Sequence, residues 1–313
     1  MKLGLLFSSV VSGEVFHWSD HKHHLCGNEF EECVIPAGDE IILDSNMNVG
    51  QLTVNGKLTW DTTVPGLTLN SSAILVNDGG IFECGTPDNP MNHQANIFIK
   101  SPIYGWNPWD ETATGVGYHE EFGSRFFVGT AGSTIYLHGR ELKQTWALHV
   151  GFSGEGATEI PLNYPNQELG WQVGDEIAIA TNNRDDSSRH IITAIDGAKI
   201  TIEPGLPSAR PSQAFNYGTA DNPRWISKNA EVINLTRTIR IYGHDAEMTL
   251  NGFHTGTFGW EENKESIFDV RYVRVQNCGQ NNIVGRHCFN FSLKKDCRKC
   301  RLEGKFNIKI GFE

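Results

Sequence analysis

The sequence predicts an all-β fold, a β-solenoid whose coils stack on one another. A short phrase, in which apolar residues alternate with polar ones before a glycine turn, recurs along the chain. Its copies are L-T-V-N-G at 52–56, I-L-V-N-D-G-G at 74–80, I-Y-L-H-G at 135–139, I-R-I-Y-G at 239–243 and M-T-L-N-G at 248–252. The first two copies lie roughly 22 to 24 residues apart, which suits one coil of a stacked β-structure. Each unit is too short to bury its own apolar face, so neighbouring coils must cover one another.

Composition and charge narrow the fold class and the partners. The 33 glycines fall at strand ends rather than in one linker, which favours many tight turns. A net charge of −11 argues against nucleic acid as a partner, because no basic stripe is available to replace counterions. An acidic polysaccharide would have to bind through local arginines, aromatic side chains or a bridging cation.

The amino terminus is predicted to be a signal peptide. One lysine precedes a short apolar stretch, and small residues before Glu14 fit a cleavage site, so residues 1–13 are expected to be removed. The alternative is a first buried strand. No later segment approaches 18 apolar residues, so no membrane span is predicted. The chain is therefore expected to be secreted or extracellular.

Seven cysteines and three N-x-S/T sequons fit a secretory environment. The spacing favours local disulfides between Cys26 and Cys33 and between Cys297 and Cys300, and the odd count leaves one thiol over. The second pair also has the spacing of half a zinc site, but no second such pair exists, so no metal site is predicted. The predicted glycosylation sites are Asn70, Asn234 and Asn290.

The order of patterns divides the chain into three parts after the signal peptide. Residues 14–154 carry the first coils and a long loop at 101–122 that lacks periodicity. Alternating strands and a hairpin around Asp196-Gly197 predict a small antiparallel β-barrel with its connector at 155–225. The strand-turn phrases resume at 226–313, where the stack is expected to be incomplete.

Ordered motifs over roughly 270 residues are similar to those of one known family. They are I-P-A-G-D at 35–39, L-T-V-N-G-K-L at 52–58, L-H-G at 137–139 with Trp146, V-G-D-E-I at 173–177, and G-Q at 279–280 with G-R at 285–286. In this order they resemble the G-eight (eight-glycine) domain family, whose members include a hyaluronan-binding protein, a transmembrane hyaluronidase and fibrocystin. The resemblance implies a right-handed parallel β-helix, an inserted barrel and, in members that cleave hyaluronan, Ca²⁺ as a cofactor.

Two departures limit what the resemblance carries over. Members that act on hyaluronan continue after the Gly-Arg pair with a histidine-x-histidine pair, whereas Asn290 and Ser292 stand at those positions here. The family's β-helix also continues for many more coils than this chain, which ends at Glu313 and is expected to be truncated. A role of the histidine pair in metal or glycan contact is therefore not carried over.

The loop at 101–122 and the residues directly after it supply the candidate site. Glycan hydrolysis commonly uses two carboxyl groups about 5 to 10 Å apart. Trp106 and Trp109 offer faces on which sugar rings stack, and Arg125 offers a planar fork for a uronate carboxylate. The alternative is a solvated acidic loop that its tryptophans clamp to the solenoid. The candidate catalytic residues are Asp110, Glu111, His119 and Glu121.

Three functions follow from this reading. The preferred one is an extracellular glycan-binding or adhesion module, whose partner is an extracellular polysaccharide, such as hyaluronan, or a cell-surface glycoprotein. The second is a calcium-assisted depolymerase, a glycosidase acting on hyaluronan-like polysaccharide. The third is a purely structural ectodomain fragment. The missing histidine pair and the missing later coils favour the first over the second.

Overall fold

The computed structural model describes residues 13–20, 26, 31–100, 117–180, 187–244, 252–259, 261, 264–280, 283–292, 297–304 and 306–308. The chain forms two compact units, one made of Met1–Arg140 with Arg237–Glu313 and the other of Glu141–Thr236. All of the predicted signal peptide except Gly13 lies outside the described residues, as does most of the phrase at 248–252.

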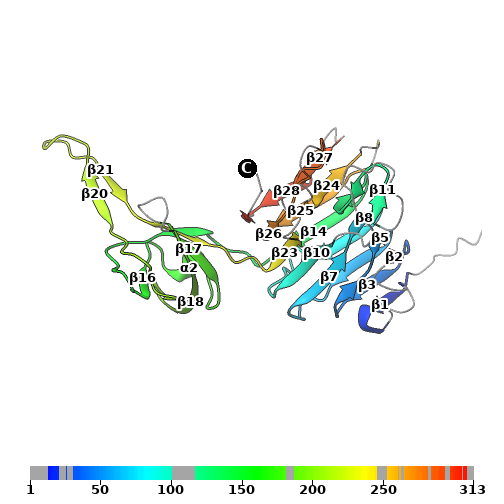
Figure 1. Cartoon of the computed structure of the whole chain (residues 1–313), viewed down its shortest axis with the longest axis horizontal. Helices are drawn as coiled ribbons and strands as arrows, with labels where there is room; N and C mark the ends of the chain where they lie inside the picture. Colours follow the sequence, from blue (N-terminus) through cyan, green and yellow to red (C-terminus); the bar gives the residue numbers. More distant parts are fainter. Residues whose placement is uncertain are drawn as a thin grey trace, which may run out of the picture. The chain divides into compact units, whose positions relative to one another are not determined.

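The first unit is a β-helix-like stack of three parallel sheets, which confirms the all-β prediction at this level (Figure 1). Sheet A contains β1 (Val15–His17), β3 (Glu40–Leu43), β6 (Lys57–Trp60), β9 (Ile81–Cys84), β14 (Thr134–His138), β25 (Ile267–Arg271) and β28 (Cys300–Glu303). Sheet B contains β2 (Glu32–Ile35), β5 (Gln51–Val54), β8 (Ala73–Val76), β13 (Phe126–Gly129), β24 (His254–Phe258) and β27 (Phe289–Ser292). Sheet C contains β4 (Met47–Asn48), β7 (Leu67–Ser71), β10 (Ala95–Ile99), β23 (Ile239–Gly243), β26 (Val273–Gln276) and β29 (Phe306–Ile308).

Each coil passes through sheet B, then sheet A, then sheet C, and the next coil repeats this order. Leu52 pairs with Ile74 in the neighbouring coil, so the spacing of the first two phrases is one coil, as predicted. The later phrases fall elsewhere, at 135–139 in sheet A and at 239–243 in sheet C. The phrase therefore marks the end of a strand in any of the three sheets and not one fixed position in the coil. Strands of all three sheets share it because each alternates inward and outward residues.

The coils approach one another closely at the glycine turns. A Cβ atom on Gly56 would lie 2.1 Å from the Pro36 carbonyl oxygen, and one on Gly80 would lie 2.2 Å from that of Val54. These positions accept only glycine because a backbone of the adjacent coil fills the space of the side chain. Beside them, Asn77 donates a hydrogen bond of 2.8 Å to Asn55, which links the same turn in two coils.

The inward residues of the three sheets form one continuous core. It includes Leu58, Ile97, Phe127 and Val270, all of which are fully buried. Cys84 also lies there as a free thiol, and burial raises its pKa well above the ordinary value. Burying apolar surface against the neighbouring coils provides the stabilisation that a single coil lacks.

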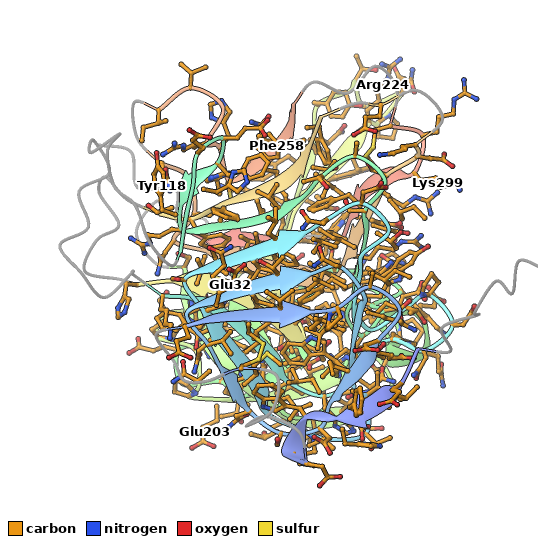
Figure 2. The ribbon with its side chains drawn as sticks, turned by 90° about the vertical axis from the view of Figure 1, so that its right-hand side faces the viewer. Glu32, Tyr118, Glu203, Arg224, Phe258 and Lys299 are labelled. Carbon is orange, nitrogen blue, oxygen red and sulfur yellow. A yellow bond between two sulfur atoms is a disulfide. The ribbon has the colours of Figure 1, made fainter. Side chains whose placement is uncertain are left out.

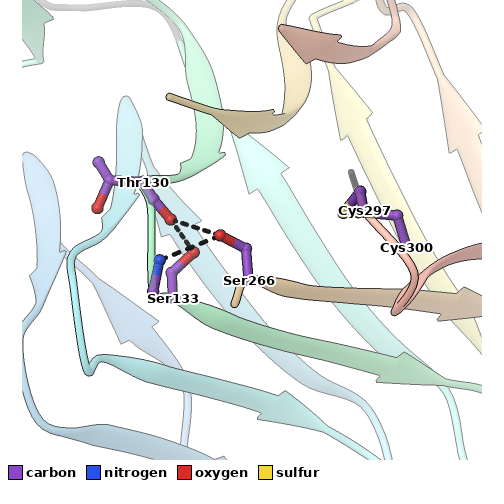
Figure 3. The surroundings of a disulfide bond; sticks show 6 residues. Thr130, Ser133, Ser266, Cys297 and Cys300 are labelled. Atoms are coloured by element: carbon purple, nitrogen blue, oxygen red, sulfur yellow. Dashed lines mark hydrogen bonds between the residues drawn. A yellow bond between two sulfur atoms is a disulfide. The ribbon is translucent and has the colours of Figure 1, made fainter. Parts of the chain in front are cut away.

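Three disulfides tie down loops of this unit. The two predicted pairs, Cys26–Cys33 and Cys297–Cys300, are present, and Cys278–Cys288 is a third pair that the spacing did not indicate. Figure 3 shows Cys297 and Cys300 together with Thr130, Ser133 and Ser266 of a neighbouring turn. In that turn, the hydroxyls of Ser133 and Ser266 donate to the Thr130 carbonyl at 2.6 and 3.3 Å.

The second unit is built on an antiparallel sheet and one short helix, α2 (Asn166–Leu169). The sheet runs in the order β15 (Trp146–Leu148), β22 (Glu231–Asn234), β17 (Glu176–Ile179), β18 (Ser188–Asp196), β19 (Lys199–Glu203) and β16 (Glu159–Pro161). The expected boundaries of 155 and 225 would leave β15 and β22 in the solenoid, whereas both strands pair within this sheet. A separate hairpin joins β20 (Gln213–Asn216) to β21 (Trp225–Lys228).

Among the described residues, no helix has the length and apolar character needed to cross a membrane.

Candidate functional site

Four of the candidate site residues, Trp106, Trp109, Asp110 and Glu111, lie outside the described residues. The other candidates lie on or beside a short hairpin that joins β11 (Tyr118–His119) to β12 (Gly123–Ser124). At its tip, the Glu121 amide donates to His119 Nδ1 at 3.1 Å, and the Glu121 side chain is exposed. The His119 ring stacks on Phe122 with centroids 4.5 Å apart. The hairpin thus presents acidic groups to solvent and an aromatic side to the sheet below.

Arg125 follows this hairpin and is fully buried, with a backbone φ of 58°. A Cβ atom on Gly243 would lie 3.4 Å from its Nη2 atom, so the guanidinium extends into the interior beside the end of β23. A left-handed backbone at a non-glycine residue is uncommon and is held here by the packing around it. The side chain therefore lies inside the coil rather than on the surface, where a uronate would meet it.

The hairpin covers the outer face of sheet B at β8, β13 and β24. Its Phe122 packs with outward residues of three sheet B strands in a second buried cluster. Ring centroids lie 5.7 Å apart for Phe122 and Phe126, and 5.1 Å apart for Phe122 and Phe258. Figure 2 labels Tyr118 and Phe258 in the upper part of the stack, whereas Glu32 lies in a lower coil. The cluster consists of Ala73, Leu75, Phe122, Phe126, Val128 and Phe258.

Polar contacts fasten the hairpin to this face. The fully buried His254 donates from Nε2 to the Phe122 carbonyl oxygen at 2.9 Å. Gln280 donates from Nε2 to the Ser124 carbonyl at 2.8 Å, and Arg286 donates to Gln280 at 3.1 Å. Burial lowers the pKa of His254 to about 4, the hydrogen bond to Phe122 opposes that shift, and the Arg286 charge adds to it.

The outer face of sheet C is built differently, because half-exposed polar and aromatic side chains line it. One row crosses five adjacent strands in register, from β4 to β26. Within the row, the rings of Phe98 and Tyr242 lie 4.9 Å apart at 31°. We call this row the sheet C ladder, and it consists of Asn48, Asn70, Phe98, Tyr242 and Gln276.

A second row of Thr68, Asn96, Arg240 and Arg274 lies beside the ladder. The Arg240 guanidinium sits 4.1 Å from the centroid of the Tyr242 ring and donates to Gln276. Lys100 donates to Asn48 at 2.9 Å at the ladder's edge. Among the described outward residues of β4, β7, β10, β23 and β26, none is acidic. This face therefore combines aromatic rings, amides and cations in a chain of net charge −11.

The outer face of sheet A carries ion pairs between coils. Lys57 lies 3.2 Å from Glu40 and 2.9 Å from Glu83 in the two adjacent coils. His138, from the L-H-G motif, is buried, and its Nε2 atom lies 3.3 Å from Asp269 of the next coil. Burial lowers the His138 pKa, although Asp269 opposes that shift. Lys57 therefore links three neighbouring coils, and His138 links two.

The described residues contain no group of three or more His, Cys, Asp or Glu side chains close enough to hold a metal ion. The Ca²⁺ that the resemblance implies therefore has no such cluster of side chains in the described parts of the chain.

The three sequon asparagines occupy different environments. Asn234 is fully buried, donates from Nδ2 to Asp175 at 2.8 Å and accepts a hydrogen bond from the Thr236 amide at 2.9 Å. Asn290 is half-buried, and its Nδ2 donates to the Gly285 carbonyl. Asn70 points outward from β7 on the sheet C ladder. Because a sugar attaches to Nδ2, the folded position of Asn234 leaves no room for one.

Comparison with known proteins identifies the architecture. Residues 18–148 match the family model of the G8 domain. This segment of the chain is a G8 domain. The matched G8 segment supplies the first three coils, the hairpin, β13 and β14, and it includes the ladder residues Asn48, Asn70 and Phe98. Tyr242 and Gln276 come from coils beyond it.

Relatives share similarity over most of this chain. A G8 domain-containing protein of Dictyostelium discoideum is 24% identical over 305 residues, which cover 92% of this chain and 24% of that protein. Fibrocystin-L of Mus musculus is 25% identical over 317 residues, which cover 84% of this chain and 7% of the relative. The chain thus spans about a quarter or less of these relatives. The G8 family and the three disulfides are consistent with an extracellular domain module.

Sequence reasoning missed the ladder. Phe98 and Tyr242 are separated in the chain by the whole second unit, and only the pairing of β10 with β23 brings them together. A signal was present, since the phrases A-N-I-F-I at 95–99 and I-R-I-Y-G at 239–243 share the same alternation with an aromatic at the fourth position. Aligning the two strands would have placed both rings on one face.

Proposed function

We propose that this chain is an extracellular glycan-binding module of the G8 family and that the sheet C ladder is its binding surface. The observation that carries the proposal is the row of aromatic and amide side chains, free of acidic residues, along five adjacent strands. Four strand spacings of about 4.8 Å make this row roughly 19 Å long. A row of that length suits several consecutive units of an extended polymer better than one small molecule.

The chemistry of the ladder matches that of a sugar chain. Aromatic faces such as those of Phe98 and Tyr242 present apolar surface against which the C–H face of a pyranose ring packs. Amides such as Asn48 and Gln276 offer both a donor and an acceptor to ring hydroxyls. Arg240 is positioned by its contact with Tyr242, so it loses little conformational freedom when it binds a carboxylate.

We further propose a hyaluronan-like polysaccharide as the ligand, because Arg240, Arg274 and Lys100 add local positive charge. These cations counter the repulsion that a net charge of −11 would exert on an acidic polymer. Trp106 and Trp109 remain predicted additional contacts. Arg125, being fully buried, is no longer proposed as a uronate ligand.

Two finer structural points belong to the same proposal. We propose that the stack winds as a right-handed β-helix, as the resemblance to the G-eight family implies. We also propose that the six-stranded sheet of the second unit closes into a barrel. Support for closure comes from the antiparallel bridge between His149 and Leu162, which follow β15 and β16 at the two ends of the sheet order. The backbone amide of Asn163 also donates to the Leu148 carbonyl at 2.9 Å.

Retention on a glycan array tests the binding function. The secreted protein is expected to bind at least one polysaccharide class, and Tyr242→Ala is expected to reduce that retention about tenfold. Tyr136→Ala is the matched control, because Tyr136 is also half-exposed and outward but lies on sheet A. Equal losses in the two variants would contradict the assignment to sheet C. No retention on any glycan by folded protein would favour the structural reading.

The same preparation tests the depolymerase reading, for which Asp110, Glu111, His119 and Glu121 remain the predicted catalytic residues. Incubation with high-molecular-weight hyaluronan, followed by gel electrophoresis, is expected to leave the polymer length unchanged. Shortening that a chelator stops would favour a calcium-assisted glycosidase over a binding module.

A further inference from the structure

Asn70 combines two features that no other sequon asparagine shares: a side-chain amide without a hydrogen bond among the described residues and a place on the ladder. Within the described residues its side-chain amide makes no hydrogen bond, and it lies between the buried Leu69 and Ser71 on the solvent side of β7. The amide of Asn234, by contrast, is buried against Asp175, and that of Asn290 is engaged with Gly285. Among the described residues, Asn70 is therefore the sequon asparagine whose Nδ2 no hydrogen bond engages.

The neighbours of Asn70 are the ladder itself. In the parallel register it pairs with Asn48 of the preceding coil and with Phe98 of the following coil. Side chains paired in this way lie about one strand spacing, roughly 4.8 Å, apart on the same face. A sugar linked to Asn70 would thus start beside the Phe98 ring, which is itself 4.9 Å from Tyr242.

We propose that Asn70 carries an N-linked glycan whose first sugars lie on the ladder and occupy the glycan-binding surface of the protein's own sheet C, an inference that rests on the proposed binding function. The attached glycan acts as a tethered ligand. A short flexible tether holds a ligand at an effective concentration on the order of millimolar. Free polysaccharide must therefore compete with it, and removal or trimming of the glycan exposes the surface.

The test compares the glycosylated protein, secreted from a eukaryotic host, with Asn70→Gln from the same host. Mass spectrometry of the peptide that contains Asn70 measures occupancy. Affinity is measured with two probes, hyaluronan and a chitin hexasaccharide. We expect Asn70 to carry a glycan. We also expect Asn70→Gln to bind at least one of the two probes at least tenfold more tightly than the glycosylated protein does. Asn290→Gln is the matched control and should bind as the unmodified protein does.

The outcomes separate this inference from the function it rests on. The inference is overturned, while the binding function stands, if Asn70 carries no glycan. It is also overturned if Asn70 is occupied but the glycosylated protein and Asn70→Gln have affinities equal within twofold. Binding of neither probe by either folded form overturns both. If Asn70→Gln does not fold, endoglycosidase trimming of the natural protein to a single sugar replaces it. Tighter binding after trimming supports the inference, and unchanged binding overturns it.

Discussion

The outer faces of sheets B and C obey the same inward–outward alternation, yet among the described residues sheet B is covered at β8, β13 and β24, whereas the sheet C ladder is half-exposed. On sheet B the outward positions carry apolar residues such as Leu75 and Phe126, and the hairpin of β11 and β12 lies over them. On sheet C they carry Asn70, Phe98 and Tyr242, which are half-exposed. The fold of a coil therefore does not decide which outer face is buried. The segment inserted after a strand decides it, because outward residues match whatever covers them.

The largest effect should come from emptying the covered face. Phe126→Ala removes a fully buried ring and is expected to lower the free energy of unfolding by about 3–5 kcal/mol. Phe98→Ala on the open face should cost roughly 1–2 kcal/mol, because that ring is half-exposed and loses less burial. Urea unfolding of the two variants measures the difference, and similar losses would show that the two faces are covered alike.

Acid should loosen the covered face before the open one. His254 is neutral in the folded protein down to a pKa of about 4, while the unfolded chain takes up a proton near pH 6.5. Stability from this group is therefore fully present above about pH 6.5 and falls as the pH drops towards 4, by about 3 kcal/mol. Arg286 is the charged group facing it, and a second positive charge there is unfavourable.

His254→Gln measures this contribution. The drop in unfolding free energy between pH 7 and pH 4 is expected to be about 3 kcal/mol smaller in the variant than in the natural protein. His93→Gln, at an exposed position, serves as the control and should leave the drop unchanged. An identical drop in all three proteins would mean that His254 takes up its proton equally in the folded and unfolded chains.

Local sequence patterns predicted contacts between neighbouring coils but not contacts across the insertion. The spacing of roughly 22 to 24 residues predicted one coil, and Leu52 does pair with Ile74 of the next coil, because neighbouring coils are local in the chain. Cys297–Cys300 was predictable for the same reason, whereas Cys278–Cys288 needs the turn that carries Gln280 and Arg286. The burial of Arg125 and the meeting of Phe98 with Tyr242 depend on contacts across an insertion, which no local pattern encodes.

A substitution on the open face should weaken ligand binding more than one on the covered face, which is the reverse of the order expected for stability. Phe98→Ala is expected to weaken glycan binding about tenfold, or about 1.4 kcal/mol. Phe258→Ala, which opens the covered face, should leave the affinity per folded molecule unchanged. Titration by biolayer interferometry, with the folded fraction measured in parallel, gives both values. A larger loss in Phe258→Ala would move the binding surface from sheet C to sheet B.

The smallest effect should come from a single charge on the open face. Arg274→Gln keeps a polar side chain in the second row but removes its charge, so it is expected to weaken hyaluronan binding about threefold, or roughly 0.7 kcal/mol. The loss should shrink as salt rises to about 1 M, where screening acts within about 3 Å. Binding of a neutral chitin hexasaccharide should not change. Arg189→Gln, an exposed arginine of the second unit that pairs with Glu176 at 3.2 Å, is the matched control. If Arg189→Gln weakens hyaluronan binding as much as Arg274→Gln does, the whole-protein charge rather than the sheet C face governs the encounter.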